Sequence, residues 1–402
     1  MIESKGQIRA CVYLNLPLGS RHGWGVCGKY ITRELAKLEA VRLITEPFED
    51  EAIGHPLEAQ ELRGVLLGQT EIERFPIRDE VRFADGSLLQ GIANYTLTPI
   101  NPRIRGKTTL GYTFFELNLV QPAWIENGRR CFDRVISGSS WCTRILAEAG
   151  LDQVATVVQG IDPAVFYPAT GVAAVREFLA DKFAVFSGGK FELRKGQDLV
   201  IRAFKVLQDR HPDAVLVNAW FNPWPETMQS MSSSRLIRIT PQNGPYVQVI
   251  NRILADNGID LRRVITCPPQ SNFAMARIYR NTDVGLFPNR CEGGTNLVLM
   301  EYMACGQPVV AVNSTGHADI VNSGNALVIA SKGSITLHCD QKPIAVWPEP
   351  DLDDTIDKLE WAYQHREALR DLGRQAAQDL ARWTWRRTAE TFQKLIWETA
   401  GQ

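Results

Sequence analysis

The stretch that decides the fold is VGLFPNRCEGGTNLVLMEYMACGQPVVAV, residues 284–312. It opens with a short apolar run that ends at Pro288, passes a glycine pair, and then has a helical pattern from about Thr295 to Gly306. A second apolar run follows at residues 308–312. A strand, a helix and a strand in this order predict two parallel strands in one sheet, joined by a helix that covers a face of that sheet.

The same alternation continues outward through the second half of the chain. The further elements expected there are strands at 183–189, 214–220 and 263–269 and helices at 196–212, 247–258 and 272–282. The regular order predicts a parallel sheet with helices on both faces, whose ligands bind at the carboxyl ends of the strands. From about residue 351 the chain is helical in pattern and rich in tryptophan.

The first half of the chain starts in a similar way. An apolar run at residues 8–18 leads into a glycine-rich turn and then a helical pattern from Tyr30, while a later strand ends at residues 137–140 before a helix near Trp141. Residues 46–94 indicate only mixed short strands and helices. Glycine and proline become frequent at residues 157–171, which is typical of a linker. We therefore expect an α/β protein of two Rossmann-like domains, with a boundary near Pro168.

Composition narrows the class of protein. The 402 residues suit two domains, and 45% hydrophobic with 22% charged residues is typical of globular proteins. The net charge is −1 and no run of five like charges occurs, so no nucleic-acid partner is expected. No apolar run is long enough for a membrane span, and residues 1–20 do not resemble a signal peptide, which predicts a cytoplasmic protein without an integral membrane segment. Peripheral membrane contact is left open.

Glu301 is unusual because it is the only charged residue between Gly293 and Ala318. An unpaired carboxylate in an apolar helix is costly to bury, so a ligand hydroxyl or a distant side chain should satisfy it. The alternative is a solvated charge on an exposed helix edge. The amides of Gly293, Gly294 and Thr295, at the expected helix start, could bind phosphate, although a glycine pair can equally mark a tight turn.

A second group of polar residues lies in SGGKFELRKGQDLVIRAF, residues 187–204, which begins at the end of an expected strand. It contains Gly189, Lys190 and Lys195 before a helix. Two cations at the same sheet edge suit a diphosphate, while solvated surface lysines are the alternative interpretation.

These motifs resemble the retaining glycosyltransferases of the GT-B fold in the large GT4 family, also called glycosyl transferases group 1. Lys195 matches the family lysine, Lys190 stands where the family usually has arginine, and Glu292 and Glu301 resemble its paired glutamates. Here eight residues separate the glutamates, where the family usually has seven. The resemblance extends to GWGVCGKYITREL, to VISGSSWCTRILAEAG and to the linker, and ARWTWRRTAE is similar to the tryptophan-bearing C-terminal helix of the family.

The resemblance implies two domains facing across a cleft, with an acceptor-side domain at 1–168, a donor domain at 169–375, and a helix at 376–402 that returns to the N-terminal domain. It also implies that Glu301 holds the donor ribose, that Glu292 contacts the transferred sugar, and that Lys190 and Lys195 bind the diphosphate. The full set of expected donor-binding residues is Gly189, Lys190, Lys195, Glu292, Gly293, Gly294, Thr295, Asn296 and Glu301.

On the acceptor side we expect Gly23, Trp24, Gly25 and Thr113, with Glu116 orienting or deprotonating an acceptor hydroxyl. The groups given catalytic roles are Glu292, Lys195, Lys190 and Glu116. His22 and His317 are further candidates for the cleft, each with an unremarkable loop histidine as the alternative. Asp351 and Asp353 are interpreted as solvated charges at a helix start. The eight scattered cysteines have no metal-binding spacing, and neither a metal nor another cofactor is expected.

The expected function is sugar transfer, with retention, from a UDP- or GDP-linked sugar to a hydroxyl of a glycan or other acceptor, in polysaccharide or glycoconjugate biosynthesis. Two alternatives remain at this point. One is a sugar-nucleotide epimerase or hydrolase on the same fold, and the other is a catalytically silent subunit that binds a nucleotide sugar.

Overall fold

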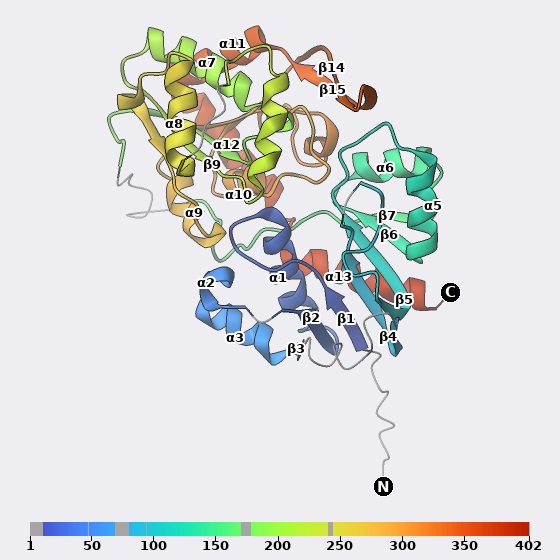
Figure 1. Cartoon of the computed structure of the whole chain (residues 1–402). Helices are drawn as coiled ribbons and strands as arrows, with labels where there is room; N and C mark the ends of the chain where they lie inside the picture. The colour runs from blue at the N-terminus through green and yellow to red at the C-terminus, as the bar shows by residue number, and fades with distance from the viewer. Residues whose placement is uncertain are drawn as a thin grey trace.

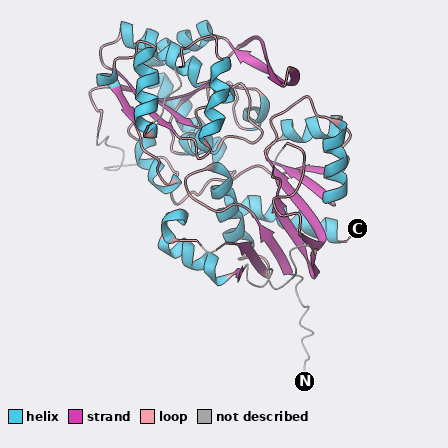
Figure 2. Cartoon of the chain, in the orientation of Figure 1, coloured by secondary structure: helices cyan, strands magenta, loops and turns pink. Residues whose placement is uncertain are grey.

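The computed structural model describes residues 11–46, 48–68, 80–93, 95–169, 178–239 and 244–401. It has two lobes, each built on its own parallel sheet, as Figure 1 shows. Helices surround the strands of both lobes in Figure 2. Residues 8–10 of the expected first strand, and residues 170–177 just after the expected domain boundary, lie outside the described residues.

The N-terminal sheet has the strand order β3-β2-β1-β4-β5-β6-β7, with every pair parallel. Its strands are β1 (Cys11–Asn15), β2 (Val41–Thr45), β3 (Leu66–Gly68), β4 (Val81–Gly91), β5 (Ile104–Thr113), β6 (Arg134–Ser137) and β7 (Val154–Thr156). Its helices are α1 (Gly23–Leu35), α2 (Asp50–Ile53), α3 (Pro56–Gly64), α5 (Pro122–Cys131) and α6 (Ser140–Glu148).

The C-terminal sheet has the order β10-β9-β8-β11-β12-β13, again all parallel. Its strands are β8 (Phe183–Gly189), β9 (Ala214–Trp220), β10 (Val264–Thr266), β11 (Val284–Phe287), β12 (Val309–Val312) and β13 (Leu327–Ile329). The helices are α7 (Gln197–Arg210), α8 (Tyr246–Asp256), α9 (Asn272–Tyr279), α10 (Leu297–Ala304), α11 (Leu352–Gln364), α12 (Arg366–Leu380) and α13 (Trp385–Ala400). Short 3₁₀ helices are η2 (Leu193–Lys195), η3 (Pro225–Ser233), η4 (Leu261–Arg263) and η5 (Thr315–Asp319).

The order of strands and helices expected for the second half of the chain is confirmed. Two helices, one in each half, begin at other residues than expected. Helix α1 begins at Gly23, inside the segment expected to be a turn, and His22 caps it by accepting from the Gly25 amide. The glycines there serve close packing, because a Cβ at Gly28 would lie 2.0 Å from the Pro17 carbonyl oxygen. Helix α10 begins at Leu297 rather than near Thr295, after Asn296 adopts a left-handed φ of 65°.

An antiparallel hairpin, β14 (Ser331–Cys339) and β15 (Lys342–Pro350), was not expected from the sequence. The second strand reaches the N-terminal lobe, where Asn118 hydrogen-bonds both the amide and the carbonyl of Val346. Trp347 donates its indole N–H to the Glu116 carbonyl at 2.9 Å. The hairpin therefore joins the two lobes on one side of the cleft.

The C-terminal helix α13 lies against the N-terminal lobe, which confirms the expected return of the chain (Figure 1). Trp385 stacks on Tyr30 of α1 with ring centroids 5.3 Å apart, and Phe392 packs edge-on against Tyr112 of β5. The Trp385 amide also donates to the Ile161 carbonyl. Burial of these aromatic rings makes a large apolar contribution to the free energy that holds α13 on the N-terminal lobe.

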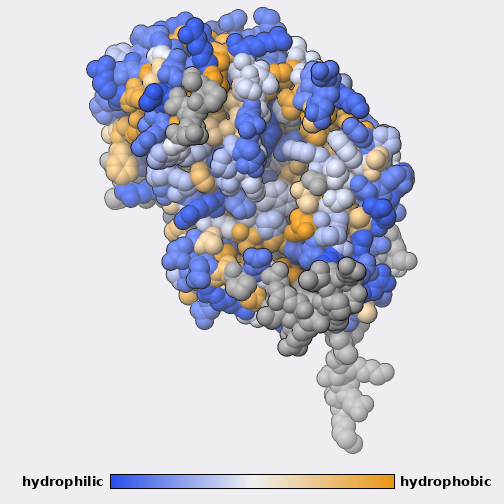
Figure 3. Space-filling model, viewed as in Figure 1, coloured by the Kyte–Doolittle hydropathy of each residue, from blue (hydrophilic) through white to orange (hydrophobic). Residues whose placement is uncertain are grey.

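The outer surface in Figure 3 is mainly hydrophilic over both lobes, with smaller hydrophobic areas between. Within the described ranges, every helix is too short or too polar to cross a bilayer.

We expect Trp385→Ala to lower the free energy of unfolding by about 3–5 kcal/mol, because the change leaves a cavity against Tyr30. Trp397→Ala on the same helix is the matched control, since Trp397 is 60% exposed, and we expect a change of about 0.5 kcal/mol or less. Urea unfolding of both variants measures the difference. Equal losses would mean that α13 is not held by the Trp385 contact.

Candidate functional site

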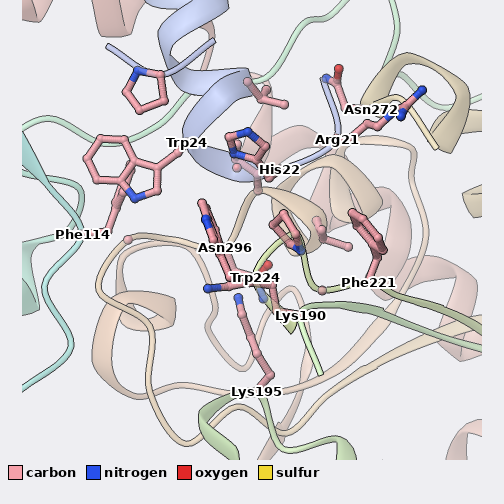
Figure 4. A pocket seen from close by; sticks show the side chains of 18 of the residues that line it. Arg21, His22, Trp24, Phe114, Lys190, Lys195, Phe221, Trp224, Asn272 and Asn296 are labelled. Atoms are coloured by element: carbon pink, nitrogen blue, oxygen red, sulfur yellow. The ribbon is translucent and has the colours of Figure 1, made fainter. Parts of the chain in front are cut away.

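A pocket of about 590 Å³ lies between the two lobes and is lined by residues of both. Its lining includes residues at or just after the ends of the strands β8, β9 and β10, as expected for parallel sheets. Figure 4 shows Lys190, Lys195, Trp224 and Asn296 converging on it from the C-terminal lobe, with His22 and Trp24 on the N-terminal side.

The two lysines of the glycine-rich turn both line the pocket, and both already have carboxylate partners. Lys190 pairs with Glu192 at 2.9 Å and lies over the ring of Trp224. Lys195 pairs with Glu292 at 2.5 Å. Gly189, at φ 116°, brings the end of β8 against the Lys195 side chain. The expected pair of cations is thus brought together at this sheet edge.

Arg194, which the sequence reasoning missed, is the centre of the charged network. Its Nη1 lies 3.1 Å from Glu292 and 3.4 Å from Glu116 of the other lobe, while its Nε lies 2.9 Å from Glu192. Glu116 also accepts from the Tyr95 hydroxyl at 3.0 Å. The arginine therefore links carboxylates of both lobes.

The charges of this network stabilise one another against the cost of burial. Burial disfavours ionised Glu192, but Arg194 and Lys190 outweigh it and lower the pKa of that carboxyl to about 2. Burial likewise opposes ionisation of Glu292, yet Lys195 and Arg194 hold its pKa below the ordinary value. Burial lowers the pKa of Lys195 despite its Glu292 partner.

The glycine pair lies where the lobes touch. A Cβ at Gly293 would lie 2.7 Å from the backbone of Phe115, and the Gly293 carbonyl accepts from Ser139 at 2.7 Å. The Thr295 amide donates to Gln159 of the linker at 3.3 Å. Gly294 and Asn296 line the pocket, whereas Gly293 and Thr295 do not. Leu297 and Val298, in the first turn of α10, also line the pocket.

His317 lies beneath this turn rather than in the pocket lining. It is fully buried in η5, and its Nε2 lies 3.2 Å from Nδ2 of the Asn296 side chain. Burial lowers the pKa of His317 to about 4, so the ring is neutral at physiological pH. Its contact is with a pocket-lining side chain, not with the pocket itself.

Glu301 is buried and lines the pocket, which excludes the alternative of a solvated surface charge. Its carboxyl accepts from Tyr279 at 3.2 Å and from Asn272 at 3.4 Å, both on α9. Burial raises the pKa of Glu301 to about 8. This pocket therefore favours a neutral carboxylic acid at Glu301 at physiological pH.

Most of the expected acceptor-side residues line the N-terminal wall of the pocket. Gly23, Trp24, Thr113 and Glu116 do so, while Gly25 lies behind them against Gly19. His22 also lines the wall, although its Nδ1 is used to cap α1. Burial, reinforced by the charge of Lys190, lowers the pKa of His22.

Asp351 caps α11 by accepting from the amides of Asp353 and Asp354, which confirms the helix-start interpretation. Among the described residues, no cluster of three or more His, Cys, Asp or Glu side chains could hold a metal ion.

Comparison with known proteins places this site in a family. The model of the family described as "Glycosyl transferases group 1" matches residues 174–379, which is half of the chain. The chain belongs to the group 1 glycosyltransferases. The matched part contains Lys190, Arg194, Lys195, Glu292 and Glu301, which all line the pocket.

Curated relatives carry names of the same kind. The chain is 26% identical over 244 residues to a D-inositol 3-phosphate glycosyltransferase of Paenarthrobacter aurescens, covering 60% of this chain and 50% of that protein. It is 31% identical over 152 residues to a GDP-mannose-dependent mannosyltransferase of Mycolicibacterium smegmatis, covering 36% and 34%. The chain spans about half the length of the first of these relatives.

Solved structures of low identity share the whole fold. A sucrose-phosphate synthase from Thermosynechococcus elongatus gives a TM-score of 0.66 at 16% identity, covering 97% of this chain and 99% of that one. Anabaena Alr3699/HepE in complex with UDP-glucose gives 0.61 at 12% identity, covering 96% and 99%. These likenesses and the two parallel sheets show the GT-B fold.

Sequence reasoning missed the partners that complete this transferase site, chiefly Arg194, Asn272, Tyr279 and Trp224. Arg194 directly precedes the family lysine, and a buried pairing role could have been suspected from the alternating charges of Lys190, Glu192 and Arg194. Asn272 and Tyr279 gave no such signal, since they lie more than twenty residues from Glu301.

The raised pKa of Glu301 predicts a pH dependence of stability. The unfolded chain loses this proton near pH 4.5 and the folded chain near pH 8, so its contribution is constant below the first value and falls between the two. The groups that act on it are Lys29, Asp162, Asn272 and Tyr279.

Between pH 4.5 and about pH 8, Glu301 should lower the free energy of unfolding of the wild type by up to about 1.4 kcal/mol per pH unit. We expect this decrease to be absent in Glu301→Gln. Denaturant unfolding of the ligand-free wild type and variant at several pH values measures it. A constant difference between the two proteins from pH 5 to about pH 8 would contradict a neutral Glu301.

We expect Arg194→Met to destabilise the protein by about 3–5 kcal/mol at neutral pH, since it removes the buried counter-ion that Glu116, Glu192 and Glu292 share. The loss should shrink in acid, because Arg194 lowers the pKa values of Glu192 and Glu292 in the wild type and this stabilisation disappears as both gain protons. Adding Glu292→Gln should recover part of the loss. Arg262→Met is the control, because the Arg262 side chain is 90% exposed. A pH-independent loss would indicate a packing role instead.

Proposed function

We propose that this chain is a retaining glycosyltransferase that moves a sugar from a nucleoside-diphosphate sugar to an acceptor hydroxyl. The observation that carries the proposal is the placing of Lys190 and Lys195 in the same pocket as the buried Glu301, on the face opposite the acceptor-side lobe. A diphosphate needs paired cations, and a ribose offers hydroxyls to a carboxyl group.

In the proposed reaction, the donor diphosphate takes over Lys190 and Lys195 from their present carboxylate partners. This exchange releases Glu292 from Lys195 and leaves Arg194 as its counter-ion. Positive groups around the departing diphosphate stabilise the charge that develops as the glycosidic bond breaks. Amides in the first turn of α10 add the positive end of the helix dipole.

The remaining roles follow from position in the pocket. Glu292, held ionised, faces the transferred sugar, and Glu301 holds the ribose hydroxyls. Glu116 and Thr113, at the end of β5, orient the acceptor hydroxyl. We propose no protein nucleophile and no metal ion: the leaving phosphate helps to deprotonate the acceptor.

The donor we propose carries UDP or GDP. Anabaena Alr3699/HepE shares the fold and was solved with UDP-glucose, and the mycobacterial relative is named for GDP-mannose. A cytoplasmic location and a glycan acceptor belong to the same proposal.

A thermal-shift panel of UDP-, GDP- and ADP-sugars tests the donor, because a ligand of the folded state raises the melting temperature. With the stabilising donor, NMR of the product reports the anomeric configuration, which we expect to be retained. Inversion would overturn the retaining mechanism. Free nucleotide at turnover rates without acceptor would indicate a hydrolase, and donor binding with no turnover at all would indicate a silent subunit.

We expect Lys195→Ala to weaken the donor and its free nucleoside diphosphate together, by about 2 kcal/mol or more, which is roughly thirtyfold in Kd. Titration calorimetry measures both ligands. Lys394→Ala, whose side chain is 76% exposed on α13, is the matched control. An unchanged Kd for both ligands would remove Lys195 from the donor site.

A further inference from the structure

The acceptor-side wall of the pocket is aromatic and apolar. The side chains that give it this character are Pro17, Trp24, Ile92, Tyr95, Ile100 and Phe114. Trp24 packs edge-on against Phe114 with centroids 4.7 Å apart, and the two lie next to each other in Figure 4. Polar groups on this wall include Thr113 and Glu116 at the end of β5.

This wall offers little positive charge. Within the described part of the N-terminal lobe, Arg21 is the one lysine or arginine that lines the pocket, and it lies exposed at the rim. Burial and the charge of Lys190 lower the pKa of His22, which disfavours a positive charge on that ring. Glu116 adds a negative charge that Arg194 already compensates.

The cations that line the donor side of the pocket are already paired with carboxylates. Lys190, Arg194 and Lys195 face an equal number of carboxylates, namely Glu116, Glu192 and Glu292. A bound donor adds a negative charge on each of its phosphoryl groups. The occupied cleft is then negative before any acceptor arrives, and a second anion would be repelled at short range in a water-poor site.

We propose that the acceptor is an uncharged saccharide whose ring stacks on Trp24 and whose reacting hydroxyl meets Glu116. This inference rests on the proposed function and names the class of its second substrate. The C–H face of a sugar ring carries partial positive charge and suits the negative face of an indole. The hydroxyls of the sugar suit the polar end of the wall, at Thr113 and Glu116.

The inference separates this chain from relatives named for D-inositol 3-phosphate, a compound that is an anion. A phosphate ester needs dedicated cations, usually arginine forks, and those at the centre of this cleft are already paired. The preference for an uncharged acceptor over its phosphate ester can therefore be measured directly.

The experiment uses the full chain with the donor that stabilises it. Glucose, mannose and inositol are each offered as the free sugar and as the phosphate ester, and release of nucleoside diphosphate is followed. We expect kcat/KM for the free form of the preferred sugar to exceed that of its ester by about tenfold or more. The KM of the free sugar should hardly change with salt, while the donor KM rises as salt screens the lysines.

Two variants at Trp24 test the stacking contact. We expect Trp24→Leu to raise the acceptor KM by about tenfold with the donor KM nearly unchanged, and Trp24→Phe to retain most of the affinity. Trp397→Leu, on the exposed face of α13, controls for loss of a tryptophan elsewhere. A purely structural role of Trp24 would move both KM values, or would not be rescued by phenylalanine.

Preference for a phosphate ester, or a full acceptor affinity in Trp24→Leu, would overturn the inference while leaving the transferase proposal intact. Failure of the transferase proposal has different signatures. These are no stabilisation by any nucleotide sugar, release of nucleoside diphosphate without an acceptor, or donor binding with no turnover at all.

Discussion

The site depends on one buried interaction, the guanidinium of Arg194 between carboxylates of both lobes. An isolated carboxylate at Glu116 or Glu292 would be expensive in this cleft, and a lone arginine equally so. Together they are compatible with burial because each charge has a close partner. The lobes must therefore approach closely for the network to exist, so the electrostatics of the site and the arrangement of the lobes are a single constraint.

Several other features serve that approach. The glycine pair allows backbone contact with Phe114 and Phe115, since a side chain at either glycine would collide with the other lobe. On the same side, Trp347 of the hairpin binds the Glu116 carbonyl and so fixes the backbone that carries the Glu116 side chain. The glycines before this helix thus allow the lobes to pack, and Gly294 also lines the pocket. The expectation of phosphate-binding amides covered only the second of these roles.

The sequence could predict what is local. Strand β8 coincides with the expected residues 183–189, and most strands and helices of the C-terminal lobe fall within a few residues of their expected bounds, because buried parallel strands and amphipathic helices have clear periods. The hairpin β14–β15 was missed because β14 is largely exposed and the pair interrupts the regular alternation of strand and helix. The apolar residues of β15, among them the buried Trp347, could have indicated a strand. Lys195 was found from its place after a glycine-rich turn at a strand end, and it also matches the family lysine. Arg194 depends on partners up to 98 residues away that only the fold brings together.

Glu292 and Glu301 show how one pocket can keep two buried carboxyl groups in different protonation states. Both are buried to a similar degree, so burial raises both pKa values. Lys195 and Arg194 reverse that effect at Glu292, whereas Glu301 has mainly neutral neighbours, Asn272 and Tyr279. Such separation of pKa values assigns different roles to like groups. Under the proposed reaction, the ionised Glu292 suits positive charge developing at the anomeric carbon, and the neutral Glu301 can both donate to and accept from a pair of ribose hydroxyls.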